Sequence, residues 1–324
     1  MHTADFTKTA SDGKTIYVHR WVPDVPSRAM LLVAHGMAEH GLRYVHLARA
    51  MTAASWSVYA PDHRGHGKTA ESSELGWFAE RDGFGRVVDD LREVADQARA
   101  EQPGLPLFVL GHCMGSLIAL ALAGLHGEIF SGCVLAGVLA EPTAAQLAAG
   151  KLISAAGCLF NAQVKSAPLL DRLTVGTKNR GFEPARTAYE WLSRDREEVD
   201  SYAADPLCGF VCSYGFFRDL FAGLDLVYGP GGCSDRASPG LPFYLVAGDA
   251  DAMGGARGSV QALGTRLRSA GAVDVETRLY PGARHALLSE TNRDEIMLDL
   301  RRWLDLRART PRRERVETAS GGER

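Results

Sequence analysis

Cysteine is scarce in this chain of 324 residues, which has six in total and no Cys-x-x-Cys pair. That number is too low for a disulfide scaffold, and the cysteines are not clustered as zinc ligands are. An excess of charge of one sign is also lacking, because 36 Lys and Arg stand against 39 Asp and Glu, for a net charge of −3. Such a balance gives no general attraction to nucleic acid or to an anionic membrane. We therefore predict no nucleic acid partner.

Long apolar runs are missing too. No run approaches the roughly 20 residues that span a bilayer, and the first residues, 1–5, are polar. The chain has no internal repeat and neither of the common glycine-rich phosphate loops. Its 46% hydrophobic and 23% charged residues are typical of a globular protein. We expect a cytoplasmic globular protein without an integral membrane segment.

Short apolar runs alternate with longer helical patterns along much of the chain. The runs 30–34, 57–60 and 107–110 are uninterrupted, which is typical of strands buried on both faces of a mostly parallel sheet. Between the last two, apolar residues of 84–98 recur at the spacing of one helix face. The alternation returns near the C-terminus, with strands and helices predicted over 243–247, 260–267, 275–280 and 296–306. This order predicts an α/β fold.

The stretch from about 140 to 240 breaks this alternation. It contains three helical patterns, over 143–160, 184–202 and 216–228, and no strand pattern comparable to those of the core. We interpret it as a helical cap over the carboxyl ends of the strands. The end of the chain lacks apolar periodicity, so we expect it to be disordered. The predicted division is a core of 1–140 and 240–306, a cap of 141–239 and a disordered tail of 307–324.

A sharp turn that carries a nucleophile is predicted at 111–115, which reads Gly-His-Cys-Met-Gly. It follows a predicted strand and precedes a helical run, as the Gly-x-Ser-x-Gly elbow does, with Cys113 where Ser is usual. Small flanking residues are needed because a Cβ there would collide with the neighbouring strand or helix. The pattern occurs nowhere else in the chain. A tight turn around an inert, buried Cys is the competing interpretation.

A base and an acid follow in the order that this kind of elbow requires, nucleophile, acid and then His. His285 is the only histidine after His126, so it is the predicted base. The acid is expected after the strand that ends at 247, where Asp249 and Asp251 are both candidates. Such a carboxylate orients the imidazole and stabilises imidazolium. The loop 35–41 after the first buried strand, together with the amide of Met114, is expected to form an oxyanion hole.

These segments resemble the monoacylglycerol lipase and lysophospholipase branch of the α/β-hydrolases. The resemblance is carried by segments spread over most of 16–306: 35–44 (HGMAEHGLRY), 62–67 (DHRGHG), the elbow, 205–210 (DPLCGF), 248–254 and 280–290. It implies an eight-stranded sheet with a helical cap, no cofactor and no metal. It also implies that Asp251 is the acid and that the amides of Met37 and Met114 form the oxyanion hole.

Three residues depart from the pattern of that branch: Cys113 replaces Ser, Ser116 stands where a second Gly is common, and Ala286 follows His285 where Glu is usual. Cys113 allows three interpretations: a nucleophile in its own right, a replacement of Ser that traps an acyl-enzyme, or a site that has lost its activity. The other cysteines are interpreted as packing residues: Cys133, Cys158, Cys208, Cys212 and Cys233. His63 and His66 are interpreted as structural.

Three functions remain open at this point. The first is an acyl hydrolase that cleaves a lipid-like carboxylic ester or thioester through an acyl-Cys intermediate. Because thiolate is a good leaving group, a second hypothesis is an acyltransferase or cyclase that moves an acyl group from a thioester, including an acyl-carrier thioester, to an amine, hydroxyl or thiol. The third is a non-catalytic protein that binds an apolar ligand.

Overall fold

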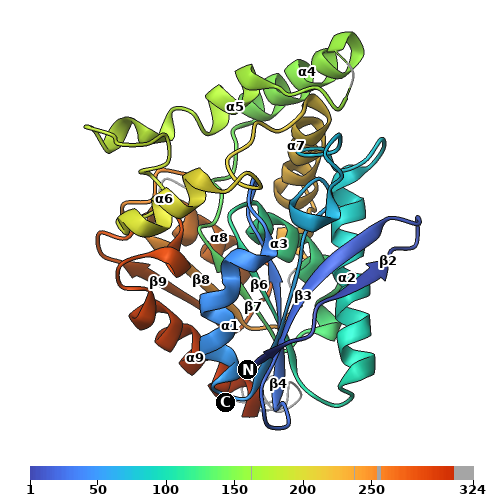
Figure 1. Cartoon of the computed structure of the whole chain (residues 1–324), viewed down its shortest axis with the longest axis vertical. Coiled ribbons are helices and arrows are strands. Elements are labelled where there is room, and N and C mark those ends of the chain that lie inside the picture. Colours follow the sequence, from blue (N-terminus) through green and yellow to red (C-terminus); the bar gives the residue numbers. More distant parts are fainter. Residues whose placement is uncertain (162, 237, 254–256, 310–324) are drawn as a thin grey trace.

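The computed structural model describes residues 1–161, 163–236, 238–253 and 257–309. One sheet forms its centre, with the strand order β1-β3-β5-β4-β6-β7-β8-β9 and β2 beside β3 (Figure 1). All pairs from β5 through β4 to β9 are parallel, and β3 joins β5 antiparallel. The strands are β1 His2–Thr3, β2 Phe6–Thr9, β3 Thr15–Val22, β4 Ala29–Ala34, β5 Trp56–Pro61, β6 Leu107–His112, β7 Gly132–Ala136, β8 Phe243–Gly248 and β9 Val275–Tyr280.

The predicted α/β fold is confirmed, and the sheet is larger than the resemblance implied. Within the described residues it has nine strands instead of eight, because the short N-terminal strands β1 and β2 both pair with β3. Every residue of β4, β5, β6, β7 and β8 is buried, which explains their uninterrupted apolar runs.

Helices cover both faces of the sheet (Figure 1). Side chains of one strand alternate between two apolar cores: Met30 and Leu32 pack with α2, α3 and α8, whereas Leu31 and Val33 pack with α1 and α9. The helices are α1 Val45–Thr52, α2 Gly83–Glu101, α3 Met114–His126, α4 Ala144–Asn161, α5 Pro168–Thr174, α6 Arg196–Ala204, α7 Tyr214–Tyr228, α8 Arg257–Ser269 and α9 Arg293–Arg309. None of the described helices is both long and apolar enough to cross a bilayer.

The chain between β7 and β8 contains α4, α5, α6 and α7, and we call residues 137–242 the insertion. Figure 1 shows α4 and α5 farthest from the sheet, with α7 descending toward α3. The charged helical pattern over 184–202 predicted one helix, but α6 begins only at Arg196, where the side chain of Asp195 accepts a hydrogen bond from the amide of Glu197. Before Arg196 the backbone forms hydrogen bonds with another segment instead of a helix, because the carbonyl of Leu192 accepts the amide of Ala286 at 2.7 Å.

The last helix also differs from the expectation. It continues to Arg309, three residues into the segment that was expected to be disordered from 307. Arg307 explains the extension, because its guanidinium bonds both oxygens of Asp274 at 2.7 and 2.9 Å and lies over the ring of Trp303. Residues 310–324 lie outside the described part of the chain.

Gly115, near the start of α3, packs against the backbone at the end of β4, and this contact leads to a first prediction. A Cβ built on Gly115 would lie 2.0 Å from the carbonyl oxygen of Ala34, which is backbone and cannot yield. We expect Gly115→Ala to lower the free energy of unfolding by about 3 kcal/mol, as overpacking does. Gly258→Ala is the matched control, because a Cβ there meets no atom within 4 Å. Urea denaturation of both variants measures the effect, and a Gly115→Ala protein as stable as the parent would contradict it.

Candidate active site

The turn from β6 into α3 holds Cys113 in a strained backbone conformation. Its φ is 54°, a value that residues with a side chain rarely adopt. The amide of Cys113 donates to the carbonyl of Ala136 at 3.0 Å, and Ser116 bonds the Cys113 carbonyl through its amide and its hydroxyl. A Cβ on Gly111 would lie 2.1 Å from the carbonyl oxygen of Gly115, so both flanking glycines are sterically required. This geometry is that of the expected elbow, with the thiol at the amino end of α3.

Asp251 and His285, which the sequence separates by 34 residues, meet at the carboxyl edge of the sheet. Asp251 follows β8 and His285 follows β9, which is the next strand in the sheet. The Nδ1 atom of His285 lies 3.0 and 2.9 Å from the two carboxylate oxygens of Asp251. One of these oxygens also accepts the amide of Met253 at 2.7 Å. The other candidate acid, Asp249, bonds the amide of Gly282 instead.

The Asp251–His285 pair is buried and charged. Burial opposes ionisation of Asp251, but the charge and hydrogen bond of His285 outweigh it and lower the pKa of the carboxyl group. Burial likewise opposes protonation of His285, yet the charge and hydrogen bond of Asp251, together with the nearby Cys113 thiol, raise the pKa of the imidazole well above its usual value. Nε2 of His285 is buried and has no hydrogen bond partner among the described residues. The ring is therefore held by the carboxylate through Nδ1, and its other nitrogen is left free.

Two backbone amides remain available beside Cys113. In the described part of the chain, neither the amide of Met37 nor that of Met114 donates a hydrogen bond to the protein. Met37 lies in the loop after β4, whose next residue, Ala38, has a φ of 52°. The carbonyl of Ala38 accepts hydrogen bonds from the amide of Gly209 and the hydroxyl of Tyr202, both at 2.9 Å. The insertion thus holds the conformation of this loop.

A largely apolar cavity of about 240 Å³ opens at Cys113. Met37 and Met114 border it on the side of the core, and the rest of its wall comes mainly from the insertion, including Leu173 and Phe221. Phe221 belongs to α7 and is buried where it borders the cavity. Phe216 and Phe217 are fully buried in the core below it. A cavity of this kind accepts an apolar chain whose reactive end lies at the sulfur.

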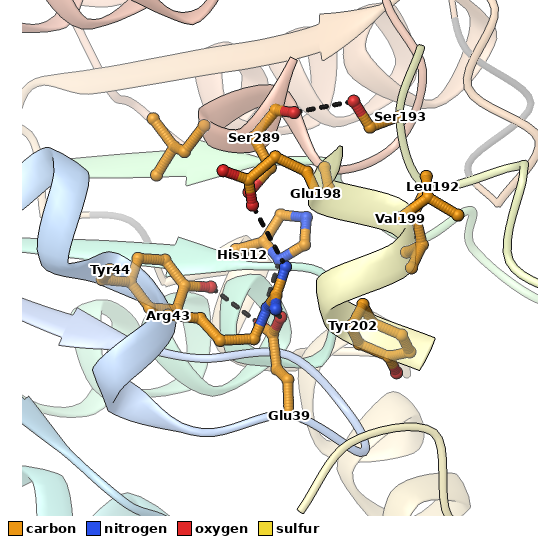
Figure 2. A pocket seen from close by; sticks show the side chains of 12 residues that line it. Glu39, Arg43, Tyr44, His112, Leu192, Ser193, Glu198, Val199, Tyr202 and Ser289 are labelled. Atoms are coloured by element: carbon orange, nitrogen blue, oxygen red, sulfur yellow. Dashed lines mark hydrogen bonds and ion pairs between the residues drawn. The ribbon is translucent and has the colours of Figure 1, made fainter. Parts of the chain in front are cut away.

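A second, smaller cavity of about 30 Å³ is bordered by His112, the residue before Cys113, and its wall combines charged side chains with apolar ones. Figure 2 shows Glu39, Arg43, Tyr44 and His112 on one of its sides, with Glu198 of α6 opposite. The carboxylate of Glu39 accepts the hydroxyl of Tyr44 at 2.8 Å and lies 3.3 Å from Nδ1 of His112. Although burial opposes it, the hydrogen bond and charge of His112, together with Arg43, lower the pKa of Glu39 to about 2.

This polar group touches the loop that carries the candidate base, because Nε2 of His112 lies 3.2 Å from the carbonyl oxygen of His285. Sequence reasoning did not single out Glu39, Arg43, His112 or Tyr202 as site residues. Glu39 and Arg43 lie inside the segment that carried the resemblance, and His112 precedes the nucleophile, so position alone was a usable signal for these three. Nothing in the local sequence marks Tyr202, which reaches Ala38 across 164 residues.

Comparison with known proteins supports the same fold and family. The family model described as "Serine aminopeptidase, S33" matches residues 25–292. The monoglyceride lipase of Homo sapiens is 30% identical over 309 residues, which cover 93% of this chain and 90% of that protein. The monoacylglycerol lipase of Mycolicibacterium smegmatis is 29% identical over 90% of this chain and 93% of its own length. The chain belongs to the monoglyceride lipase branch of the α/β-hydrolases.

Solved structures agree in fold. A carboxyl esterase from Bacillus coagulans, determined with glycerol, superposes with a TM-score of 0.86 at 24% identity, covering 95% of this chain and 99% of that one. A soluble variant of the Saccharomyces cerevisiae monoglyceride lipase gives 0.72 at 21% identity, covering 96% and 97%. The chain is thus an α/β-hydrolase enzyme of the esterase and lipase kind. Within this branch, Cys113 occupies the elbow position at which the common motif has Ser.

Three buried histidines beside the loop after β4 generate a second prediction. His35 accepts the amide of His63 through Nε2 at 2.9 Å, which requires a neutral ring. Burial, followed by the neighbouring histidines, lowers the pKa of His35 well below its usual value and that of His63 to about 3. Burial also lowers the pKa of His66 to about 4. These rings stay neutral in the folded chain at pH values where an unfolded chain binds protons.

The pKa values of these three histidines are lower in the folded chain than in the unfolded chain, so protons bind preferentially to the unfolded chain as the pH falls. The contribution of these rings to stability is therefore complete above about pH 6.5 and is lost at lower pH. We expect the free energy of unfolding to drop by several kcal/mol between pH 6.5 and 4. The raised pKa of His285 has the opposite effect, because it lowers stability as the pH rises, and it does so only above about pH 6.5. Urea titrations at half-unit pH steps measure this, with His46→Gln on the half-exposed His46 as the control. A flat profile between pH 6.5 and 5 would refute it.

Proposed function

We propose that this chain hydrolyses a lipid-like carboxylic ester or thioester through an acyl-Cys intermediate. In this proposal Cys113 is the nucleophile, His285 transfers the proton, Asp251 orients and charges the ring, and the amides of Met37 and Met114 stabilise the oxyanion. The observation that carries it is a thiol in a strained elbow near a buried imidazole, whose Nδ1 is held by a buried carboxylate and whose Nε2 has no hydrogen bond partner among the described residues. A non-catalytic ligand pocket has no need of this charged pair.

The reaction proceeds in two balanced halves. The sulfur of Cys113 attacks the acyl carbon as a thiolate, and the carbonyl oxygen becomes an oxyanion that accepts the two free amides. His285 gives the proton on Nε2 to the departing alcohol or thiol, which leaves the acyl group on sulfur. Water then attacks the thioester, His285 takes its proton, and the acid departs with the thiolate restored. Asp251 remains ionised throughout and compensates the imidazolium charge.

Several features favour an acyl chain of apolar character. The cavity at Cys113 is lined by side chains such as Leu173, Leu220 and Phe221. On the outside of the same insertion, Leu159 and Phe160 of α4 are 82% and 84% exposed. Large exposed apolar side chains at the end of this helix fit a substrate that arrives from an apolar aggregate.

Acyl transfer is the second candidate, and Cys113 itself favours it. A thiolate is expelled from a tetrahedral intermediate more readily than an alkoxide, so an oxygen ester tends to revert to substrate while a thioester exchanges in nearly balanced fashion. The acyl-thioester on Cys113 then reacts readily with an amine or thiol. Hydrolysis and transfer share the first half of the reaction and differ only in the acceptor.

Intact-protein mass spectrometry tests the covalent step. Incubation with a long-chain acyl thioester is expected to add one acyl mass per chain, mapped to Cys113 and absent from Cys113→Ala. Cys158→Ala is the matched control, because Cys158 is the one cysteine of the six that is not buried. Acylation at another residue, or undiminished turnover by Cys113→Ala, would overturn the assignment. Adding an amine during the reaction distinguishes transfer from hydrolysis by the product formed.

Cys113→Ser adds a sharper comparison. Serine cannot supply the negative charge that helps to raise the pKa of His285. The ring is then more readily neutral and able to accept the hydroxyl proton. We expect this variant to gain hydrolysis of oxygen esters relative to thioesters and to lose any transfer to amines, which the ratio of initial rates on matched substrates measures.

The acid is tested by a pair of substitutions. Asp251→Asn removes the charge opposite His285, and we expect kcat to fall by about 10³–10⁴-fold with the protein still folded. Asp249→Asn is the control, because Asp249 bonds the amide of Gly282 and not the ring. We expect its kcat to change only severalfold. Equal losses in both variants would contradict the role of Asp251.

A further inference from the structure

A group of metal-ligating side chains lies outside the proposed catalytic residues, where the loop after β4 meets the end of α6. It consists of His40, Asp205 and Cys208, and one possible ligand atom from each lies within 4.8 Å of the other two. Nε2 of His40 is 2.9 Å from a carboxylate oxygen of Asp205. The Cys208 thiol also interacts with that carboxylate, which helps burial to raise the pKa of the thiol. One carboxylate thus joins an imidazole and a thiol.

The donors of this group match the preference of zinc. Thiolate sulfur, imidazole nitrogen and carboxylate oxygen are its protein ligands, and three of them with one open position form a frequent tetrahedral arrangement. Zinc bonds of about 2.0–2.3 Å place ligand atoms roughly 3.5 Å apart. The separations between 2.9 and 4.8 Å in this group bracket that value, so side-chain adjustments of about an ångström complete the site.

Burial and charge favour a cation at this place. His40 and Cys208 are buried, whereas the side chain of Asp205 is 29% exposed and leaves a path from solvent. Arg43 is the nearby cation, but it lies 3.8 Å from Glu39 and 3.6 Å from Glu198. These carboxylates compensate its charge, and Asp205 adds a further negative charge.

We infer that His40, Asp205 and Cys208 form a binding site for a thiophilic divalent cation, with zinc as the best-fitting ion. On binding, the thiol proton is released to solvent, and the proton on Nε2 of His40 moves to Nδ1 so that Nε2 can coordinate. The ion then joins the loop after β4 to the turn after α6. This is the same junction at which Gly209 and Tyr202 bond the carbonyl of Ala38, next to Met37.

Cobalt(II) is the probe for this site, because thiolate ligation produces an intense charge-transfer absorption in the near ultraviolet. The measurement uses full-length protein with Cys113→Ala, since Cys113 and His285 are a second thiol–imidazole pair. We expect one cobalt ion per chain with the thiolate band, and displacement of cobalt by zinc. Adding Cys208→Ser is expected to abolish the band, whereas adding Cys158→Ser, in α4, leaves it unchanged.

Two further readouts keep the test decisive if Cys208→Ser folds poorly. Asp205→Asn keeps the size of the side chain and its carbonyl acceptor but removes the charge, and we expect at least tenfold weaker cobalt binding with the thiolate band retained. Zinc is expected to raise the melting temperature of the Cys113→Ala protein and not of its Cys208→Ser derivative. Absence of the band in the parent, or its persistence without Cys208, would overturn the inference.

Discussion

Burying a charge is tolerated only when an opposite charge lies at contact distance, and the pair of Asp251 and His285 meets this condition at 2.9 Å. The two residues follow β8 and β9, neighbouring parallel strands whose carboxyl ends lie at one edge of the sheet. The elbow after β6 points Cys113 to the same edge. Removing either partner would leave an uncompensated charge in the interior, so the pair constrains both loops and through them the position of the sulfur.

The insertion contributes to the site as well as covering it. Its segment before α6 bonds the loop of His285 directly, through Leu192 and Ala286. The last turn of α6 and the segment after it bond the strained Ala38, through Tyr202 and Gly209 respectively. The loop of His285 and the loop of Met37 are therefore both held by the insertion. A displacement of α6 would disturb both the loop of His285 and the loop of Met37, because this short helix adjoins both contacts.

Cysteine at the elbow changes the electrostatics of the site in a way that serine would not. The carboxylate of Asp251 and, after it, the Cys113 sulfur raise the pKa of His285, which favours the protonated ring. Serine instead needs a neutral ring that can take a proton. The glycines and backbone hydrogen bonds of the elbow do not involve the side-chain atom at the tip of residue 113, so the same backbone geometry can carry Cys or Ser.

Local sequence was sufficient to identify the buried strands, the turn around Cys113 and the order of nucleophile, acid and base, because apolar periodicity and turn chemistry depend on neighbouring residues. It left Asp249 and Asp251 equivalent, and it predicted a helix over 184–195, where the backbone instead bonds the loop of His285. It also did not reveal that His40 meets Asp205 and Cys208. These outcomes depend on contacts between segments up to 168 residues apart, and only the packed chain, with its particular strand order, brings such segments together.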